Sequence, residues 1–412
     1  MADKFGFVGE KKNKKLGEIC HIVSGGTPSR SNLEYWDNGN IPWIKIGDIK
    51  GKYINSASEF ITRAGLDNSS AKLLKKGTIL YTIFATLGEV GILNFDACTN
   101  QAIAGITIKE DINVLPDYLY YYLKSIKNRI NKLGRGVAQN NINLSILKNL
   151  DIVVIEVKQQ KEIIKTLDCV DSIIRLHKKE LELLDTLIKA RFVEMFGDPV
   201  ANPMNWSVKK LKDLSLQISS GSTPKGGSAN YVEEGITFFR SQNVWKDRLE
   251  MNDIAYIDNE THHIMKKSSL KNGDILMTKT GRINTENSSL GRAALYTGED
   301  DMANVNGHVY FIRLKKNVNN KFVLRILVSP EYRDLIRNVC VGGIDKRQLN
   351  KEHIEEFPII CPPSEMIDAY INFVQQIDKL RFGGRKRLTK AKNTKNNNRN
   401  TITLERSTLY GK

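Results

Sequence analysis

The folded part of the sequence opens with residues 15–28, KLGEICHIVSGGTP, and the same pattern returns at residues 210–224 as KLKDLSLQISSGSTP. Both stretches have an amphipathic start, a short apolar run and an end that reads Ser-Gly, one further small residue, and Thr-Pro. That end is typical of a turn, because Gly tolerates positive φ and Pro pre-sets its own φ. The ordered return of the whole pattern indicates two copies of one domain.

The repeat continues in register beyond the turn. Tyr35 and residues 41–45 of the first copy correspond to Tyr231 and residues 236–240 of the second. Further along, the alignment pairs KGTIL at 76–80 with NGDIL at 272–276, Leu87-Gly88-Glu89 with Leu290-Gly291-Arg292, and Asn100 with Asn304. We therefore expect the two domains to share one fold.

The composition of the first copy indicates its fold class. Short apolar runs at 79–84, 104–108 and 151–155 are separated by loops rich in Gly, Asn and Thr, and one tyrosine-rich amphipathic helix is expected at 116–131. Strand-like runs interrupted by a helix predict an α/β (α+β) domain built on a mixed sheet. The tyrosines of that helix are expected to lie in the core and on the helix surface.

Residues 158–196 are different in kind, because they contain neither Gly nor Pro. Residues recur there at alternating spacings of four and three, which is the pattern of a coiled-coil seam and requires a partner helix. At 1.5 Å per residue the seam spans roughly 50 Å. Its apolar members are Ile163, Leu167, Val170, Ile174, Leu181, Leu184 and Ile188.

A second helix of the same type follows the second domain, and it is expected to pack antiparallel against the first. Its heptads are expected to end at Gly383-Gly384, where a basic, Asn-rich segment begins. Such a composition favours disorder. The expected organisation is a basic extension (1–14), a first domain (15–157), a spacer helix (158–197), a second domain (198–362), a shorter C-terminal helix (363–382) and a disordered tail (383–412).

The net charge of +16 is compatible with a polyanionic partner such as nucleic acid. Ten Lys or Arg residues and one Glu lie in residues 381–412, so the rest of the chain is only mildly basic. The five cysteines are scattered and odd in number, which fits reduced thiols in the cytoplasm. No apolar stretch approaches the length of about 20 residues that crosses a bilayer, so no membrane association is expected.

Taken together, these features resemble the specificity subunit of type I restriction-modification systems. The resemblance covers residues 15–380. It is carried by Leu16-Gly17-Glu18 before residues 24–28, by the return of that pattern at 211–224, and by the helix exit RFVEMFGDP at 191–199.

The resemblance implies a division of labour. A subunit of this family reads a split sequence in double-stranded DNA, one half per target recognition domain, with a spacing set by the helices. It performs no chemistry and holds no cofactor. Modification subunits methylate adenine N6 with S-adenosylmethionine, and restriction subunits translocate and cut DNA with ATP and Mg²⁺.

The sequence lacks motifs for catalysis, in agreement with this expectation. No Asn/Asp-Pro-Pro-aromatic motif for amino methylation is present, and Gly227 stands where a phosphate-binding loop would need Lys. A stand-alone enzyme is therefore disfavoured. Two alternatives stay open, a non-catalytic protein-interaction scaffold that uses the heptad helix, and an inactive truncated specificity allele.

Most candidate DNA contacts fall into four groups in the two copies: the Ser-Gly turns, the loop at 279–284 and its counterpart at 83–86, the amides where apolar runs resume, and the Gly-rich loops at 134–141 and 342–348. The others, Lys45, Arg240 and Gln242, lie at or just after the ends of the runs 41–45 and 236–240. Each group has a plainer interpretation as a turn, a solvated loop or a buried amide. Arg or Lys can bond guanine, Asn or Gln can bond adenine, and turn N–H groups can bind phosphate. The candidates are Thr27, Arg30, Lys45, Thr86, Asn100, Gln101, Arg135, Gln139, Asn140, Thr223, Lys225, Arg240, Gln242, Lys279, Arg282, Asn306, His308, Lys346, Arg347 and Gln348.

Overall fold

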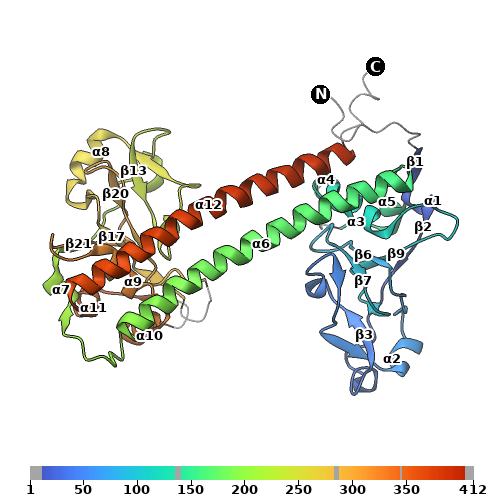
Figure 1. Ribbon diagram of the computed structural model, residues 1–412, viewed down its shortest axis with the longest axis horizontal. Coiled ribbons are helices and arrows are strands. Elements are labelled where there is room, and N and C mark those ends of the chain that lie inside the picture. Colours follow the sequence, from blue (N-terminus) through green and yellow to red (C-terminus); the bar gives the residue numbers. More distant parts are fainter. Residues whose placement is uncertain (1–11, 135–140, 283–286, 344–345, 404–412) are drawn as a thin grey trace. The chain divides into compact units, whose positions relative to one another are not determined.

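The computed structural model describes residues 12–134, 141–282, 287–343 and 346–403 (Figure 1). The chain divides into two compact units, the first made of residues 1–180 and 383–412 and the second of residues 181–382. Each unit holds one copy of the repeat. Each also holds part of two 40-residue helices, α6 (Val157–Phe196) and α12 (Ser364–Thr403).

The first domain is built on a mixed sheet, as the sequence predicts. A five-stranded sheet has the order β2 (Cys20–Ser24), β9 (Ile103–Ile108), β6 (Ile79–Thr82), β7 (Val90–Leu93) and β4 (Tyr53–Ile54). A second sheet places β3 (Ile41–Ile44) between β5 (Glu59–Ile61), which is antiparallel to it, and β8 (Cys98–Thr99), which is parallel. The strand β1 (Lys12–Lys15) pairs with β10 (Asp151–Val154) and so joins the two ends of the domain.

The helices of the first domain are short except for α3. They are α1 (Leu16–Ile19), α2 (Arg63–Asp67), α3 (Pro116–Ser125), α4 (Lys127–Gly134) and α5 (Leu144–Lys148), with 3₁₀ turns at Leu33–Tyr35 and Ile46–Asp48. The four tyrosines of α3 are buried in the main apolar cluster, which confirms the prediction. The Tyr118 hydroxyl donates to the Val153 carbonyl at 2.7 Å, and this bond fixes α3 to β10.

The second domain repeats this plan. Its main sheet has the order β12 (Ser215–Ser220), β21 (Val309–Leu314), β17 (Ile275–Thr278) and β19 (Ala293–Leu295), and β13 (Ile236–Phe239) lies between β16 (Ala255–Ile257) and β20 (Ala303–Val305). The strand β11 (Val208–Lys210) pairs with β24 (Pro358–Ile360), as β1 does with β10. The remaining strands are β14 (Val244–Trp245), β15 (Arg248–Leu249), β18 (Thr280–Gly281), β22 (Val341–Gly343) and β23 (Lys346–Gln348).

Five α-helices complete the second domain within the described residues: α7 (Leu211–Leu214), α8 (Asn259–Ile264), α9 (Asn320–Leu327), α10 (Pro330–Val339) and α11 (Lys351–Glu355). Short 3₁₀ turns lie at Gly227–Asn230, Ser241–Asn243 and Lys266–Ser268. The N-termini of α9 and α10 are capped by side chains, with Asn319 accepting from the Phe322 N–H and Ser329 from the Tyr332 N–H.

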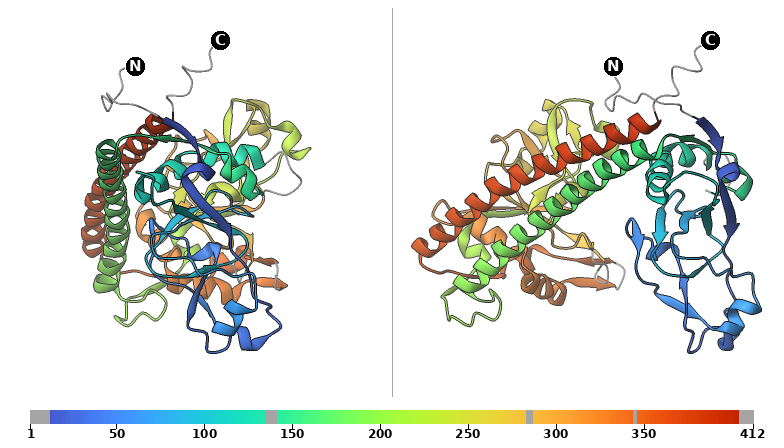
Figure 2. Two further views of the ribbon diagram at one scale, coloured as in Figure 1. Left: turned by 90° about the vertical axis from the view of Figure 1, so that its right-hand side faces the viewer. Right: turned by 45° about the vertical axis from the view of Figure 1, so that its right-hand side comes forward.

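The long helices pack against each other within each unit, antiparallel as the sequence predicts (Figures 1 and 2). In the second unit, Tyr370, Ile371 and Ile377 of α12 share an apolar cluster with Ile188 and Phe192 of α6. In the first unit, Arg387 pairs with Glu180 at 2.8 Å and Lys395 pairs with Asp171. In the second unit, an ion pair between Arg381 and Asp185, at 2.8 Å, adds to the apolar packing.

The seam residues of α6 are covered to different degrees. Ile163 and Leu167 are buried in the core of the first domain itself. Val170, Ile174 and Ile188 are buried, while Leu181 and Leu184 are half-buried. The first two seam positions therefore belong to the first domain's own core.

The predicted end of α12 at Gly383 is wrong, and so is the prediction of a shorter helix. The helix continues to Thr403, which makes α12 as long as α6. The alternating spacing also continues, through Gly384, Leu388, Ala391, Lys395 and Asn398, all of which are buried or half-buried. Composition concealed this seam, because Gly, Lys and Asn occupy positions where apolar residues are expected. Residues 404–412 lie outside the described part.

The first domain begins earlier than predicted. Lys12, Asn13 and Lys14 were assigned to a basic extension, but they belong to β1 and pair with Val154, Val153 and Ile152. A strand this short and rich in lysine has no alternation of apolar and polar residues from which it could be predicted. The first domain therefore extends from residue 12 to residue 154, the two residues at the end of this strand pair.

Candidate nucleic-acid interface

The Ser-Gly turns are structural junctions. The N–H groups of Gly25 and Gly26 donate to the carbonyls of Ile103 and Thr99, at 3.0 and 2.9 Å. In the second copy, the Gly221 N–H donates to the Val309 carbonyl at 2.9 Å. A Cβ atom at Gly25 would lie 2.1 Å from the Thr99 hydroxyl oxygen, so only Gly fits. These three N–H groups already have backbone partners, which favours the interpretation of the two stretches as structural turns.

The two loops predicted to contact DNA in the second domain lie together. In a three-stranded sheet of order β18-β23-β22, Thr280 pairs with Gln348 and Gly281 pairs with Arg347. The sheet therefore joins the loop after β17 to the Gly-rich loop after α10, although the sequence separates them by more than sixty residues.

A polar cavity of about 530 Å³ lies beside this sheet. The candidates Gln242, Arg282 and Lys346 all line it. The other lining residues are Ser241, Thr280, Gly281, Asn287, Ser288, Ser289 and Arg292. Most of these side chains donate or accept hydrogen bonds, which suits recognition of the polar edges of bases.

Other candidates of the second domain are held by neighbours within it. Arg240 forms an ion pair with Asp253 at 3.2 Å, and Gln242 donates to the same carboxylate at 3.0 Å. Arg347 donates to the Cys340 carbonyl at 3.1 Å, and Gln348 donates to Asn350 at 2.9 Å. Gln242 therefore reaches the cavity from an anchored position.

The remaining candidates of this domain differ in exposure. Thr223, Lys225 and His308 are exposed. The ammonium of Lys279 lies 5.5 Å from the centre of the Tyr310 ring, and Asn306 accepts a hydrogen bond from the His308 N–H at 3.1 Å. None of these residues lines the cavity of about 530 Å³.

In the first domain, Arg30 and Lys45 share one acidic partner. Each donates to a different oxygen of Glu59 at 2.5 Å. The hydrogen bond from Lys45, supported by Arg30, holds the pKa of Glu59 below its usual value. The Arg30 guanidinium also lies 3.6 Å from the centre of the Trp36 ring. These two cations are partly neutralised by the domain itself.

The polar residues near the first Ser-Gly turn bond to one another. The Thr27 hydroxyl donates to the Gln101 side chain, and Asn100 accepts from the Ala102 N–H at 3.2 Å. Thr86 is exposed. The candidates Arg135, Gln139 and Asn140 lie outside the described residues.

The predicted equivalence of Asn100 and Asn304 is wrong, and Asn306 is the counterpart of Asn100. Both Asn100 and Asn306 accept from the N–H two residues ahead, and both donate their own N–H to the strand that carries Ile44 or Phe239. Asn304 is instead buried and bonds to His262 at 2.6 Å. A two-residue shift in the alignment produced the error.

Sequence reasoning missed Arg292. Its side chain is only 7% exposed, and its guanidinium lies 3.8 Å from the centre of the Trp245 ring. It also donates to the carbonyls of Ser288, at 2.9 Å, and Asn287. The signal that could have found it is the charge reversal between Leu87-Gly88-Glu89 and Leu290-Gly291-Arg292.

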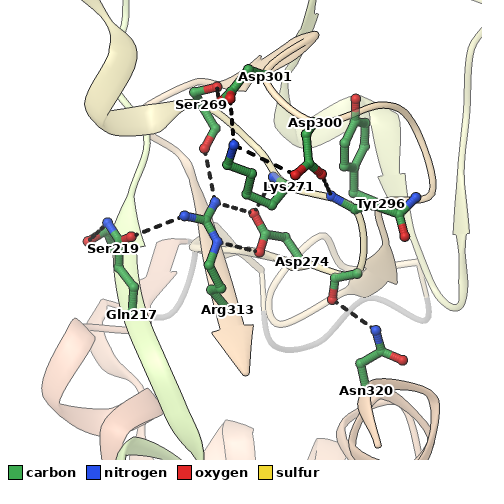
Figure 3. A network of polar contacts seen from close by, with 12 residues as sticks. Gln217, Ser219, Ser269, Lys271, Asp274, Tyr296, Asp300, Asp301, Arg313 and Asn320 are labelled. Atoms are coloured by element: carbon green, nitrogen blue, oxygen red, sulfur yellow. Dashed lines mark hydrogen bonds and ion pairs between the residues drawn. The ribbon is translucent and has the colours of Figure 1, made fainter. Parts of the chain in front are cut away.

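A second polar cavity, of about 680 Å³, lies at the edge strand β12. Figure 3 shows the network along its wall. Arg313 donates to both oxygens of Asp274, at 2.9 and 2.7 Å, and Lys271 pairs with Asp301 at 2.5 Å. These ion pairs satisfy much of the charge of the wall, so the network is mainly structural.

Within the described residues, no helix is both long and apolar enough for a membrane span, and no group of three His, Cys, Asp or Glu side chains could hold a metal ion.

Duplicated α/β domains with polar loops, carried on two long helices, define a class of tandem recognition proteins. The chain belongs to the family of the type I restriction modification DNA specificity domain, which matches residues 9–186 and residues 203–382. It is a specificity subunit of a type I restriction-modification system.

Relatives and solved structures agree with this membership. The chain is 27% identical over 391 residues to the type I restriction enzyme MjaIX specificity subunit of Methanocaldococcus jannaschii, covering 88% of this chain and 86% of the relative. It is 30% identical over 173 residues to the EcoR124I/EcoR124II specificity subunit of Escherichia coli, covering 40% and 42%. The crystal structure of an S subunit from M. genitalium has the same fold, with a TM-score of 0.55 at 16% identity over 97% of each chain.

Proposed function

We propose that the two domains read the two halves of a bipartite target in double-stranded DNA, and that the chain itself performs no chemistry. The cavity of the second domain carries this proposal. Gln242, Arg282 and Lys346 approach it from three separate segments. Arg and Lys bond guanine and Gln bonds adenine in the major groove, so such a cavity can distinguish base pairs.

The two halves of the target are expected to differ. The turn between Thr82 and Glu89 in the first domain corresponds to a longer one between Thr278 and Arg292 in the second, as matching backbone hydrogen bonds at both ends indicate. Because the longer turn supplies Arg282 and Asn287 to the cavity, the second domain has groups that the first lacks at this position.

The catalytic partners are part of the proposal. Modification subunits that use S-adenosylmethionine would methylate adenine N6, and restriction subunits would use ATP and Mg²⁺, all in the cytoplasm. Large apolar side chains on the outer surface of α6 support a protein partner. Leu176 in the first unit is 69% exposed, and Leu183 in the second is 55% exposed.

The test is to co-express this chain with its modification subunit and to map N6-methyladenine across the host genome by single-molecule sequencing. The expected result is a split motif methylated on both strands. Omitting this chain is the control, and it should abolish methylation.

Two other outcomes would favour the alternatives. Co-purification of the modification subunit without any methylation would indicate an inactive allele or a protein-interaction scaffold. The full length of α12 removes the main observation in favour of a truncated allele. Absence of both methylation and co-purification would contradict the proposed function.

A further inference from the structure

Glu89 of the first domain and Arg292 of the second occupy equivalent positions. The Thr82 N–H donates to the Glu89 carbonyl at 3.0 Å, and the Glu89 N–H donates back to the Thr82 hydroxyl at 2.8 Å. In the second domain, Thr278 and Arg292 make the same two bonds, at 2.9 and 2.8 Å. The two copies of the domain therefore have the same backbone arrangement at this position but carry side chains of opposite charge.

An ion pair neutralises the charge at this position in the first domain, whereas the described residues of the second domain supply no such pair. Glu89 forms an ion pair with Lys127 of α4. Among the described residues, no carboxylate pairs with Arg292. Its charged neighbours are Arg333 of α10 and Arg248, which, together with burial as the larger cause, lower the pKa of Arg292. Burying a cation beside other cations is costly unless an anion completes the site.

The Arg292 side chain is held in place rather than free to move toward solvent. The Trp245 ring supports one face of the guanidinium, and the carbonyls of Asn287 and Ser288 accept from it. These bonds use two of the five N–H donors of a guanidinium group. A rigid, partly satisfied guanidinium is well suited to bind an oxyanion.

Arg282 and Lys346 line the cavity of about 530 Å³ together with Arg292. Arg282, Arg333 and Arg337 line one small crevice beside Ser288, and Arg282 also lines the cavity of about 530 Å³. Burial, Arg333 and Arg292 together lower the pKa of Lys246. Of these cations, Arg337 has an acidic partner, Asp334 at 2.9 Å. These cations concentrate positive charge beside the cavity of about 530 Å³.

We propose that Arg292 and Arg333 bind a backbone phosphate of duplex DNA, which takes the place of the internal ion pair that Glu89 and Lys127 form in the first domain. This inference rests on the proposed function. It assigns the two arginines to positioning the DNA, while the neighbouring cavity reads bases, because a phosphate contact carries no sequence information.

The test uses the full-length chain in complex with its modification subunit and a duplex DNA that spans several helical turns. R292E reverses the charge beside Arg333, so that this position carries a carboxylate as it does in the first domain. The expected result is about tenfold weaker DNA binding, together with some loss of thermal stability, because the carboxylate cannot replace the bonds that Arg292 donates to the Ser288 and Asn287 carbonyls. The slope of log affinity against log salt should fall by about one. R333Q, on the surface of α10, should give the same change if R292E lowers expression.

K316E is the matched charge-reversal control, because Lys316 is exposed and follows the opposite end of β21 from the cavity. It should leave the salt slope of the complex unchanged. If the wild-type complex shows no salt-dependent binding, both the inference and the proposed function fail. If it binds but R292E and R333Q bind equally well, only the inference fails. A changed sequence in one half of the methylated motif would assign Arg292 to base reading instead.

Discussion

At the scale of single residues, the duplicated domain shows which ion pairs the fold can do without. Arg313 on β21 and Asp274, the residue before β17, form a two-bond ion pair, and Asp274 is 1% exposed (Figure 3). The same two positions in the first domain hold Thr107 and Thr78, whose hydroxyls lie 3.4 Å apart. One backbone therefore accepts either an ion pair or two hydroxyls.

This comparison predicts strong coupling between Asp274 and Arg313. D274T leaves the guanidinium without its partner and should lower the free energy of unfolding by about 3 kcal/mol or more. The double variant D274T/R313T should cost much less than the sum of the single ones, because it restores the arrangement of the first domain. Urea denaturation of all four proteins measures the coupling. The exposed pair Arg63 and Asp67 is the control, and its coupling should stay below about 1 kcal/mol.

Glu59 gives a prediction for pH. Its pKa lies below its ordinary value of 4.5 in the folded chain, chiefly because Lys45 and Arg30 bond to it. The unfolded state therefore binds the proton more readily, and the stabilisation is complete above about pH 4.5 and lost as the pH falls further. The difference in denaturation midpoint between wild type and E59Q should be present at pH 7 and should disappear under acid conditions. A constant difference would contradict this.

Sequence patterns found part of the candidate site for physical reasons. Arg282 and Lys346 could be predicted because basic residues in Gly-rich loops rarely belong to a hydrophobic core. The pairing of Arg30 and Lys45 with Glu59 was not predictable, because the acid is distant in sequence and comes close only through the β3–β5 ladder. Arg292 was missed because burial of a cation beside Trp245 leaves no periodic signal.

At the scale of elements, α12 shows the limit of composition as a guide. The apolar seam of α6 was recognised from Ile, Leu and Val at heptad spacing. The continuation of α12 past Gly383 places Gly384 and Asn398 at buried positions and Lys395 against Asp171. A helix that contains a buried glycine and is held by ion pairs to a neighbouring helix depends on tertiary contacts, and composition alone does not reveal these contacts.

The helical course of α12 predicts resistance to trypsin at Arg385, Lys386 and Arg387, although a Gly-Gly pair precedes them. A protease cleaves a locally extended backbone, and the helical backbone at these residues is not extended. G383P should open the helix at a cost of about 3 kcal/mol or more and produce cleavage there. G383A is the control and should stay resistant, because its Cβ would meet only the Arg387 side chain, at 3.4 Å. Rapid first cleavage of the wild type at these residues would instead support a disordered tail.

At the scale of the whole molecule, each domain is closed by its own first and last strands. The ladder of β1 with β10 brings together the ends of residues 12–154, and that of β11 with β24 brings together the ends of residues 208–360. Each domain has its own apolar core, which residues of the long helices complete, and its entry and exit lie side by side. The chain can therefore exchange a domain without interrupting a sheet.

This closure predicts that the two specificities separate. Residues 12–154 exchanged for the corresponding domain of a subunit with another target should change one half of the methylated motif, because the second domain and both long helices are retained. The reciprocal exchange of residues 208–360 is the matched control and should change the other half, with the same spacing between the halves. Genome-wide mapping of N6-methyladenine measures both. If either exchange altered both halves, sequence recognition would have to depend on the two domains jointly, and the modular assignment of the cavity to one half-site would be wrong.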